Sequence, residues 1–262
     1  MVPIITLTTD FGTRDPFVGV VKGVILGIAR DVHLVDLTHD IAPHHVLEGA
    51  LALEAAVGFF PPGTIHLAVV DPGVGSARRP LAVAAQGQLF VGPDNGLFSF
   101  LLAADQKWSA VCLEAAAYRL PTLSRTFHGR DVFAPAAAFL ALGTPLESFG
   151  SPVTDPLVIP WPTAIRQGEA LVGEVLHADR FGNLVTSVRA RDLGALGPVE
   201  TLVVEIEGKE MGGIVGCYAD LPPEAAGALI GSTNRLEISV REGSALAATG
   251  AARGARVRVR KR

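Results

Sequence analysis

The stretch VVDPGVGSARRP, residues 69–80, places a carboxylate, two glycines and two arginines directly after an apolar run. Glycines at this point are typical of phosphate-binding loops, but the lysine of G-x-x-x-x-G-K-[ST] and the third glycine of G-x-G-x-x-G are both absent. The carboxylate of Asp71 would also repel a phosphate. The stretch instead offers Asp71 and Arg78, which a glycine-rich turn can fold together.

Aspartates accompany several predicted strands of the N-terminal half: Asp10, Asp36, Asp71 and Asp94. Ligands of open parallel sheets bind beyond the carboxyl ends of the strands. Each aspartate alone is commonly a turn or helix-cap residue. Together they predict an oxygen-rich crevice suited to a metal ion, a ribose diol or a positively charged substrate.

Two histidine-containing stretches are further candidates. His128, in FHGRD, lies near the expected start of a helix and has Gly129 beside it, which allows close backbone approach. The adjacent pair His44 and His45 suggests a metal, but neighbouring side chains point to different faces of a helix or strand. We therefore predict no metal site.

Composition excludes several classes of protein. The 262 residues carry a net charge of −4, which gives no case for nucleic-acid or membrane binding. The basic end RGARVRVRKR alternates Arg with Val and predicts a two-faced terminal strand. No apolar stretch is long enough to span a bilayer and the N-terminus shows no signal peptide, so we expect a cytoplasmic protein with Cys112 and Cys217 reduced.

The chain predicts an α/β fold in two domains. Residues 1–150 alternate strands with helices, which favours a mainly parallel sheet. The expected strands are 3–9, 32–37, 64–70, 80–85 and 88–92, and the expected helices are 16–29, 44–59, 95–104 and 131–142. The proline-rich residues 151–168 predict a linker. Residues 169–262 read as strands with Gly and Asn turns, which indicates a smaller antiparallel, barrel-like β-domain.

Several segments, in order along nearly the whole chain, resemble one family. It comprises the S-adenosyl-L-methionine (SAM) hydrolases that form adenosine and methionine, also called SAM hydroxide adenosyltransferases, which are relatives of the SAM-dependent fluorinase and chlorinase. The segments are LTTDFGTRDPFVGVVKGVI, DLTHDIAPHHVLEGALAL, FPPGTIHLAVVDPGVGSARRPL, VGPDNGLFS, FHGRDVFAPAAA, DRFGNLVTS and GSTNRLEISVREGSA. The resemblance implies SAM as substrate, no cofactor or metal, and a homotrimer with the site between subunits.

The resemblance also implies roles for single residues. The water-handling triad of the family falls on Asp71, Arg78 and His128, and its presence favours water over halide as the nucleophile. The implied substrate-binding residues are Asp10 for the ribose hydroxyls, Asn183 with Phe181 and Tyr218 for adenine, and Ser232, Glu237 and Asp15 for the methionine part. One departure is Ser187, where the family pattern leads us to expect Asn.

The implied reaction is in-line attack of water at C5′ of SAM. The sulfonium is already a good leaving group, so orienting the water is the main task. A guanidinium favours the hydroxide form, and a histidine orients the water or accepts its proton. Three alternatives stay open: a halogenase on the same scaffold, a metal-dependent hydrolase of a phosphorylated substrate, and a non-catalytic SAM or adenosine sensor.

Overall fold

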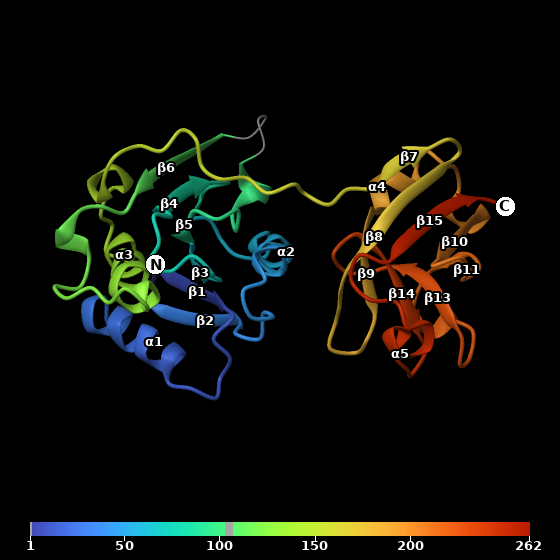
Figure 1. Ribbon diagram of the computed structural model, residues 1–262, viewed down its shortest axis with the longest axis horizontal. Helices are drawn as coiled ribbons and strands as arrows, with labels where there is room; N and C mark the ends of the chain where they lie inside the picture. The colour runs from blue at the N-terminus through green and yellow to red at the C-terminus, as the bar shows by residue number, and fades with distance from the viewer. Residues whose placement is uncertain (1, 103–106) are drawn as a thin grey trace. The chain divides into compact units, whose positions relative to one another are not determined.

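The chain divides into two compact units, Met1–Pro160 and Trp161–Arg262 (Figure 1). The computed structural model describes residues 2–102 and 107–262. The boundary between the units falls within residues 151–168, the segment expected to be a linker. Each unit has a sheet and a hydrophobic core of its own.

The first unit is built on a six-stranded sheet in the order β2-β1-β3-β5-β4-β6. Its parallel strands are β2 (His33–Thr38), β1 (Ile4–Thr9), β3 (Ile65–Val69) and β5 (Gln88–Pro93). Two strands pair antiparallel at one edge, β4 (Pro80–Ala85) and β6 (Trp108–Cys112). The mainly parallel α/β domain predicted from the sequence is confirmed. The sequence analysis did not predict β6.

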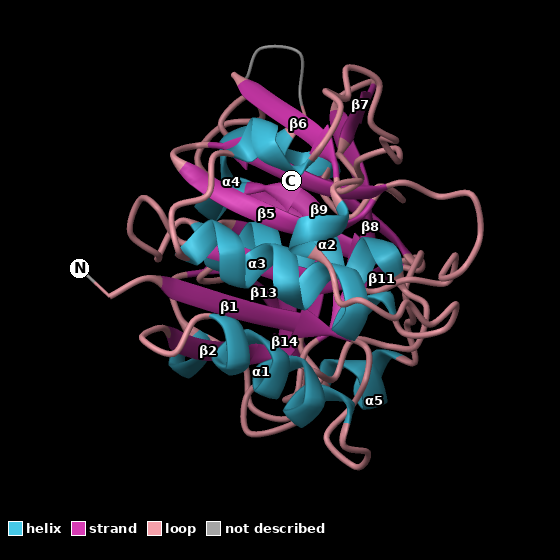
Figure 2. Ribbon diagram, turned by 90° about the vertical axis from the view of Figure 1, so that its left-hand side faces the viewer, coloured by secondary structure: helices cyan, strands magenta, loops and turns pink. Residues whose placement is uncertain are grey.

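Helices cover both faces of this sheet. α1 (Phe17–Ile28) and α3 (Ala134–Ala141) pack against each other on one face, and α2 (Val46–Val57) lies on the other (Figure 1). Figure 2 looks onto the face that carries α1 and α3. Val21 and Ile25 of α1, one helical turn apart, belong to the same buried hydrophobic cluster as Ile5 and Leu7 of β1. This packing fixes β1, at whose end Asp10 lies.

Two expected helices of this unit differ from the structure. In place of a helix over 95–104, only Ser99–Leu101 forms a single 3₁₀ turn, and residues 103 and 104 lie outside the described residues. Asn95 accepts a hydrogen bond from the backbone N–H of Leu97, and Ser99 donates one to the carbonyl of Gly96, so side chains compete with helical bonds here. The helix expected over 131–142 begins as a π-helical turn, Gly129–Phe133, and continues as α3.

The second unit is a nine-stranded sheet that curls into a half-barrel (Figure 1). All but one of its strand pairs are antiparallel, as predicted, and the exception is the short pair β12–β13. The elements are β7 (Ile165–Gln167), β8 (Ala170–Ala178), β9 (Leu184–Arg189), α4 (Ala190–Leu193), β10 (Leu202–Ile206), β11 (Lys209–Glu210), β12 (Ile214–Val215), β13 (Ala226–Ile230), β14 (Arg235–Val240), α5 (Ala245–Thr249) and β15 (Arg256–Lys261). The sequence analysis did not predict the strands β7, β11, β12 and β13.

The basic C-terminal stretch forms β15, and the two-faced strand predicted for it is confirmed. Val257 and Val259 are buried, whereas Arg256 and Arg258 are exposed. Glutamates of the neighbouring strands lie opposite these arginines: Arg256 pairs in register with Glu174, and Arg258 with Glu205. Carboxylates therefore balance this basic face. Within residues 2–102 and 107–262, no helix is long and apolar enough to cross a bilayer.

Candidate active site

The side chains of Asp71, Arg78 and His128 meet at the carboxyl end of the parallel strands. Asp71 follows β3, and Arg78 lies at the end of the loop that leads into β4. Nε of Arg78 donates to both carboxylate oxygens of Asp71 at 3.0 Å, and Nη2 also donates to Oδ2. The side chains of Arg78 and Asp71 are only 8% and 5% exposed. A buried, multiply bonded ion pair of this kind fixes the plane of the guanidinium.

His128 completes the cluster from another loop. Its Nδ1 lies 2.9 Å from Nη2 of Arg78. Arginine has no acceptor atom, so Nδ1 must accept this hydrogen bond, and the neutral ring then carries its proton on Nε2. Burial lowers the pKa of His128 below its ordinary value, and the adjacent charge of Arg78 lowers it further. His128 does not cap the π turn that follows it.

Two contacts hold the loops of the cluster together. Gly75 has a φ of +75°, and a Cβ there would lie 2.2 Å from the carbonyl oxygen of Arg125, so only glycine fits. Asp131, fully buried in the π turn, accepts hydrogen bonds from the backbone of Ser124 and from Nε of Arg130, both at 2.6 Å. Burial alone would raise the pKa of Asp131, but these bonds hold it below its ordinary value.

A cavity of about 270 Å³ opens beside the cluster. Asp10, Asp71 and His128 line it, together with three aromatic side chains, Phe11, Phe17 and Phe127, which pack edge to face. Aromatic side chains and a few polar side chains thus line the same cavity, a combination typical of small-molecule sites.

Asp10 is held by a loop from β2. Its Oδ2 accepts a hydrogen bond from the backbone N–H of His44 at 2.9 Å, and His44 has a φ of +66°. Asp15 is exposed two residues before α1 and does not line this cavity. Of the two residues predicted to bind substrate from the first unit, the structure therefore places one, Asp10, beside the cluster.

The other aspartates predicted for the crevice have different partners. Asp36 lies within β2 and contacts Lys22 at 2.6 Å and His39 at 3.1 Å. Asp94 pairs with Arg79 at 2.7 Å. His45 accepts a hydrogen bond from the backbone of Glu48 and caps α2. In the part of the chain that the structure describes, no three His, Cys, Asp or Glu side chains are grouped to hold a metal ion.

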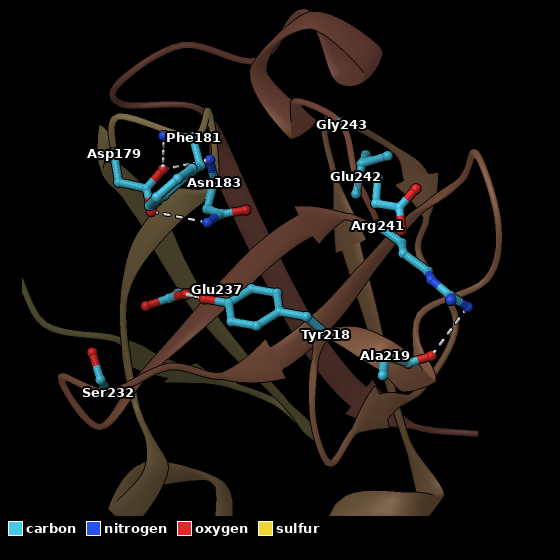
Figure 3. A pocket seen from close by; sticks show the side chains of 11 residues that line it. Asp179, Phe181, Asn183, Tyr218, Ala219, Ser232, Glu237, Arg241, Glu242 and Gly243 are labelled. Atoms are coloured by element: carbon cyan, nitrogen blue, oxygen red, sulfur yellow. Dashed lines mark hydrogen bonds between the residues drawn. The ribbon is translucent and has the colours of Figure 1, made fainter.

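A second cavity, of about 870 Å³, lies in the second unit (Figure 3). It gathers the substrate-binding residues that the sequence predicted there: Phe181, Asn183, Tyr218, Ser232 and Glu237. Phe181 is 76% exposed and Tyr218 is 47% exposed, so both aromatic rings offer a free face. An aromatic, partly acidic pocket suits a flat heterocycle that carries a positive charge nearby.

Tyr218 and Glu237 form the polar centre of this pocket. The hydroxyl of Tyr218 donates to Oε2 of Glu237 at 2.8 Å (Figure 3). Burial and this bond to a carboxylate raise the pKa of Tyr218 to about 12. Burial also raises the pKa of Glu237, although the bond from Tyr218 counteracts this. Gly231 gives Glu237 its space, because a Cβ there would lie 1.7 Å from Oε1.

Models of one protein family match both units of the chain. Residues 5–150 match the SAM hydroxide adenosyltransferase N-terminal domain, and residues 173–258 match the C-terminal domain of the same proteins. The chain belongs to the SAM hydroxide adenosyltransferase family.

Curated relatives of the family share most of the chain. An (R)-S-adenosyl-L-methionine hydrolase from Thermus thermophilus is 42% identical over 259 residues, which are 96% of this chain and 97% of the relative. One from Salinispora tropica is 38% identical over 261 residues, 98% of this chain and 97% of the relative. A fluorinase from Actinopolyspora mzabensis is 30% identical over 223 residues, 74% of each chain.

Solved structures share the fold of this chain over nearly its whole length. An uncharacterized conserved protein from Thermotoga maritima has a TM-score of 0.91 at 30% identity and covers 98% of this chain and 100% of its own. A conserved hypothetical protein from Thermus thermophilus has a TM-score of 0.79 at 39% identity, over 99% of this chain and 100% of its own. Both span the two units that carry the cavities of this family member.

Asp179 is a pocket residue that the sequence analysis did not single out. Its Oδ1 accepts from the backbone of Phe181 at 2.8 Å and of Asn183 at 2.9 Å, and its Oδ2 accepts from Nδ2 of Asn183 at 2.9 Å. It therefore shapes the turn that presents Phe181 and Asn183. The signal was available in DRFGN, because Asp, Gly and Asn close together are typical of a turn, and an Asp side chain commonly bonds to the backbone of such a turn.

Ser187, the departure from the family pattern, lies outside the pocket. It is 1% exposed in β9, and its Oγ accepts a hydrogen bond from the backbone of Glu174 at 3.0 Å. A Cβ on Gly173 would come within 2.6 Å of this oxygen, so the neighbouring strand fits closely around it. Ser187 thus contacts the β8 backbone and does not line the second cavity.

Proposed function

We propose that the protein hydrolyses SAM to adenosine and L-methionine by in-line attack of water at C5′. The observation that carries this proposal is the Asp71–Arg78–His128 cluster at the edge of a partly apolar cavity. Curated relatives that match nearly the whole chain are named (R)-S-adenosyl-L-methionine hydrolases, whereas the fluorinase relatives match less of it at lower identity.

Arg78 bonds to the two members of the cluster that line the cavity, Asp71 and His128. Its Nη1 is buried and has no hydrogen-bond partner among the described residues, whereas Nε and Nη2 are engaged by Asp71 and His128. A donor left over in a buried site favours an oxygen ligand that carries negative charge. Arg78 would therefore hold the attacking oxygen and stabilise its hydroxide form, while Asp71 fixes the guanidinium.

His128 would orient the same water as a donor. Because Nδ1 accepts the bond from Arg78, the proton on Nε2 is free to form a hydrogen bond to the oxygen of the water. In the reaction the C5′–O bond forms as the C5′–S bond breaks, and the electron pair of that bond stays on sulfur as the thioether of methionine. One proton is released for each SAM consumed. Positioning of the water supplies roughly 7–11 kcal/mol in comparable reactions.

The proposal divides the substrate contacts between the two units and, as the family resemblance implies, places each site at a subunit interface of a homotrimer. The cavity of the first unit holds the cluster and Asp10, for the ribose hydroxyls. The cavity of the second unit holds Asn183, Phe181 and Tyr218 for adenine, and Ser232 and Glu237 for the methionine part. Asp15, exposed at the start of α1, remains a proposed contact to the amino-acid end.

The proposal includes metal-independent turnover without a cofactor, in the cytoplasm. SAM carries its own leaving group, so the reaction needs no Lewis acid at sulfur. Cys112 and Cys217 are both free, which agrees with a reducing compartment.

Incubation with SAM in ¹⁸O-water, with EDTA and chloride both present, tests the proposal. Products are separated by liquid chromatography with mass detection. We expect adenosine with ¹⁸O at its 5′-hydroxyl and an equal amount of methionine. 5′-Chloro-5′-deoxyadenosine would instead identify a halogenase. Turnover that requires a divalent ion would contradict the metal-independent mechanism, and tight SAM binding without products would indicate a sensor.

A further inference from the structure

The segment VGPDNGLFS, residues 91–99, lines neither cavity described above. It begins in β5 and continues into the turn that follows. At the end of the β4–β5 ladder, the backbone N–H of Asp94 donates to the carbonyl of Arg79 at 2.9 Å. Asp94 and Arg79 therefore face each other one residue beyond the last strand pair, Pro80 and Pro93.

Asp94 and Arg79 hold the segment that leads out of the first unit. Nε of Arg79 donates to Oδ2 of Asp94 at 2.7 Å, and Oδ1 of Asp94 accepts from the backbone N–H of Leu157 at 2.7 Å. Arg79 also donates from Nη1 to Oδ1 of Asp155 and from Nη2 to its carbonyl, each at 2.7 Å. Asp94 is 7% exposed, so its carboxylate is a buried centre of this contact.

The turn after β5 holds the same segment further along. Oγ of Ser99 donates to the carbonyl of Gly96 at 2.7 Å and accepts from the backbone N–H of Ile159 at 2.9 Å. Gly96 has a φ of +94°, and a Cβ there would lie 2.4 Å from Cγ2 of Ile159. Residues 155–159 are therefore fitted to this turn by side chains and by shape.

The residues that hold this segment also adjoin the catalytic cluster. Arg79 follows Arg78 in the chain. Nδ2 of Asn95 donates to the carbonyl of Val70, the residue that precedes Asp71, at 2.8 Å. We call Arg79, Asp94, Asn95 and Ser99 the linker anchor. Both partners of the Asp71–Arg78 ion pair thus lie next to a residue that the linker anchor fixes.

We propose that the linker anchor is a positioning device, in which docking of residues 155–159 on Asp94 sets the backbone that holds Asp71 and Arg78. The proposal rests on the SAM hydrolase function. It explains why a buried carboxylate, a glycine with positive φ and a serine are gathered around a segment without strands or helices. Release of that segment would loosen Arg78 through Arg79, although neither Arg79 nor Asp94 belongs to the catalytic cluster.

The decisive variant is Asp94→Asn, which keeps the shape of the side chain but cannot accept from both Arg79 and Leu157. Because misplacement of about 1 Å can cost about 100-fold in rate, we expect kcat to fall about tenfold or more, with KM changed less than about threefold. Asp155→Ala is the matched control. It removes only an ion pair whose carboxylate is 80% exposed, so kcat should stay within about twofold of wild type.

A second readout does not depend on turnover. The pKa of His128, followed by NMR of its ring protons, reports the charges that face it, namely Arg78, Asp71, Asp131 and Arg119. If Arg78 moves away, its charge no longer lowers the pKa, so the pKa of His128 rises in Asp94→Asn and stays unchanged in Asp155→Ala. A wild-type protein that does not hydrolyse SAM would refute the proposed function and leave this readout intact.

Equal kcat and an equal His128 titration in wild type and Asp94→Asn, with only thermal stability lowered, would overturn the proposal. In that case the linker anchor would have a structural role alone. If Asp94→Asn does not fold, Ser99→Ala decides, because it removes the bonds of the hydroxyl to Gly96 and Ile159 and leaves Asp94, Arg79 and Asn95 in place. Like Asp94→Asn, Ser99→Ala should lower kcat and raise the pKa of His128. Unchanged values would again contradict the proposal.

Discussion

Nη2 of Arg78 lies 2.9 Å from Nδ1 of His128, so a guanidinium that can only donate determines which nitrogen of the imidazole is free. The neutral ring must carry its proton on Nε2. His128 therefore faces the cavity as a hydrogen-bond donor, and its role in the proposed reaction is to orient the water. Nη1 of Arg78 is buried and has no hydrogen-bond partner among the described residues, and in the proposed reaction it stabilises the hydroxide.

The first prediction concerns the shape of the Arg78 side chain. Arg78→Lys keeps the positive charge but replaces the rigid guanidinium fork by a single nitrogen on a flexible stem, which does not reproduce the fixed geometry of the bonds to Asp71, His128 and the water. We expect kcat to fall about 100-fold, comparable to the loss of one oxyanion-hole donor, with KM nearly unchanged. Arg30→Lys, at an exposed position after α1, is the control and should behave as wild type. A kcat of Arg78→Lys close to the wild-type value would show that charge alone suffices.

The second prediction concerns the pH dependence of turnover. Burial and the charge of Arg78 hold the pKa of His128 below 6.5, so the ring stays neutral until the pH falls below that value. Protonation would break its bond from Arg78 and place two positive charges together. We therefore expect kcat to be constant from pH 8 to about 6.5 and to fall below that range. The pH–rate profile of His128→Gln should lack this acidic limb. If the limb persists there, another group is responsible for it.

Sequence analysis located those site residues that lie close together in the chain and whose types and spacing already indicate a contact. Asp71 and Arg78 were paired from their spacing across glycines, and the structure joins them. Their link to His128 depends on a contact 50 residues away in the chain, which spacing cannot reveal. The sequence supplied that link only through the family resemblance.

Other features needed the structure because they depend on tertiary partners. Arg79 bonds to Asp94 and Asp155, and the second partner lies 76 residues away in the chain. The helix expected over 95–104 failed because Asn95 and Ser99 bond to nearby backbone, which an apolar pattern does not disclose. The antiparallel β-class of the second unit was predictable, whereas its strands β7, β11, β12 and β13 were not.

The third prediction concerns the stability of the first unit. His66 is fully buried and bonds to Thr6 and Gln88, and burial lowers its pKa from 6.5 to about 4. Between these values the unfolded chain binds a proton that the folded chain does not. Stability is therefore complete above pH 6.5 and is lost as the pH falls towards 4, by up to about 3 kcal/mol.

Urea unfolding at pH 7 and pH 4.5 measures this effect. His66→Gln should be less stable at pH 7 but should lose less stability on acidification than wild type does. His33→Gln, an exposed histidine at the start of β2, should keep the wild-type pH dependence. An equal loss of stability on acidification in wild type and His66→Gln would assign the effect to other groups.

The fourth prediction separates the two roles of Tyr218. Tyr218→Phe keeps the exposed ring and removes the donor to Glu237, whereas Tyr218→Ala removes both. Stacking of a base on an aromatic ring is worth about 1–3 kcal/mol, so Tyr218→Ala should raise KM for SAM about tenfold or more. Tyr218→Phe should raise it only about threefold, and kcat should change little in both. Phe59→Ala, which removes an 85% exposed ring of the first unit, is the control. Equal KM values for Tyr218→Ala and wild type would exclude Tyr218 from the adenine site.

The fifth prediction tests whether one site uses two subunits. Arg78→Ala damages the cluster of the first unit, and Tyr218→Ala damages the pocket of the second, so each homo-oligomer should be impaired. If the site lies between subunits of a trimer, mixed trimers combine an intact first unit from one variant with an intact second unit from the other. Co-expression in equal amounts should then restore about a quarter of the wild-type sites.

Analytical ultracentrifugation and activity of the co-expressed variants decide the matter together. We expect a mass three times that of the chain and an activity well above that of either variant alone, measured at a SAM concentration at which Tyr218→Ala is poorly saturated. Arg78→Ala mixed with itself under a second purification tag is the control for the procedure. Trimers without recovered activity would place both sets of contacts on the same chain, because an intrachain site always carries one of the two substitutions.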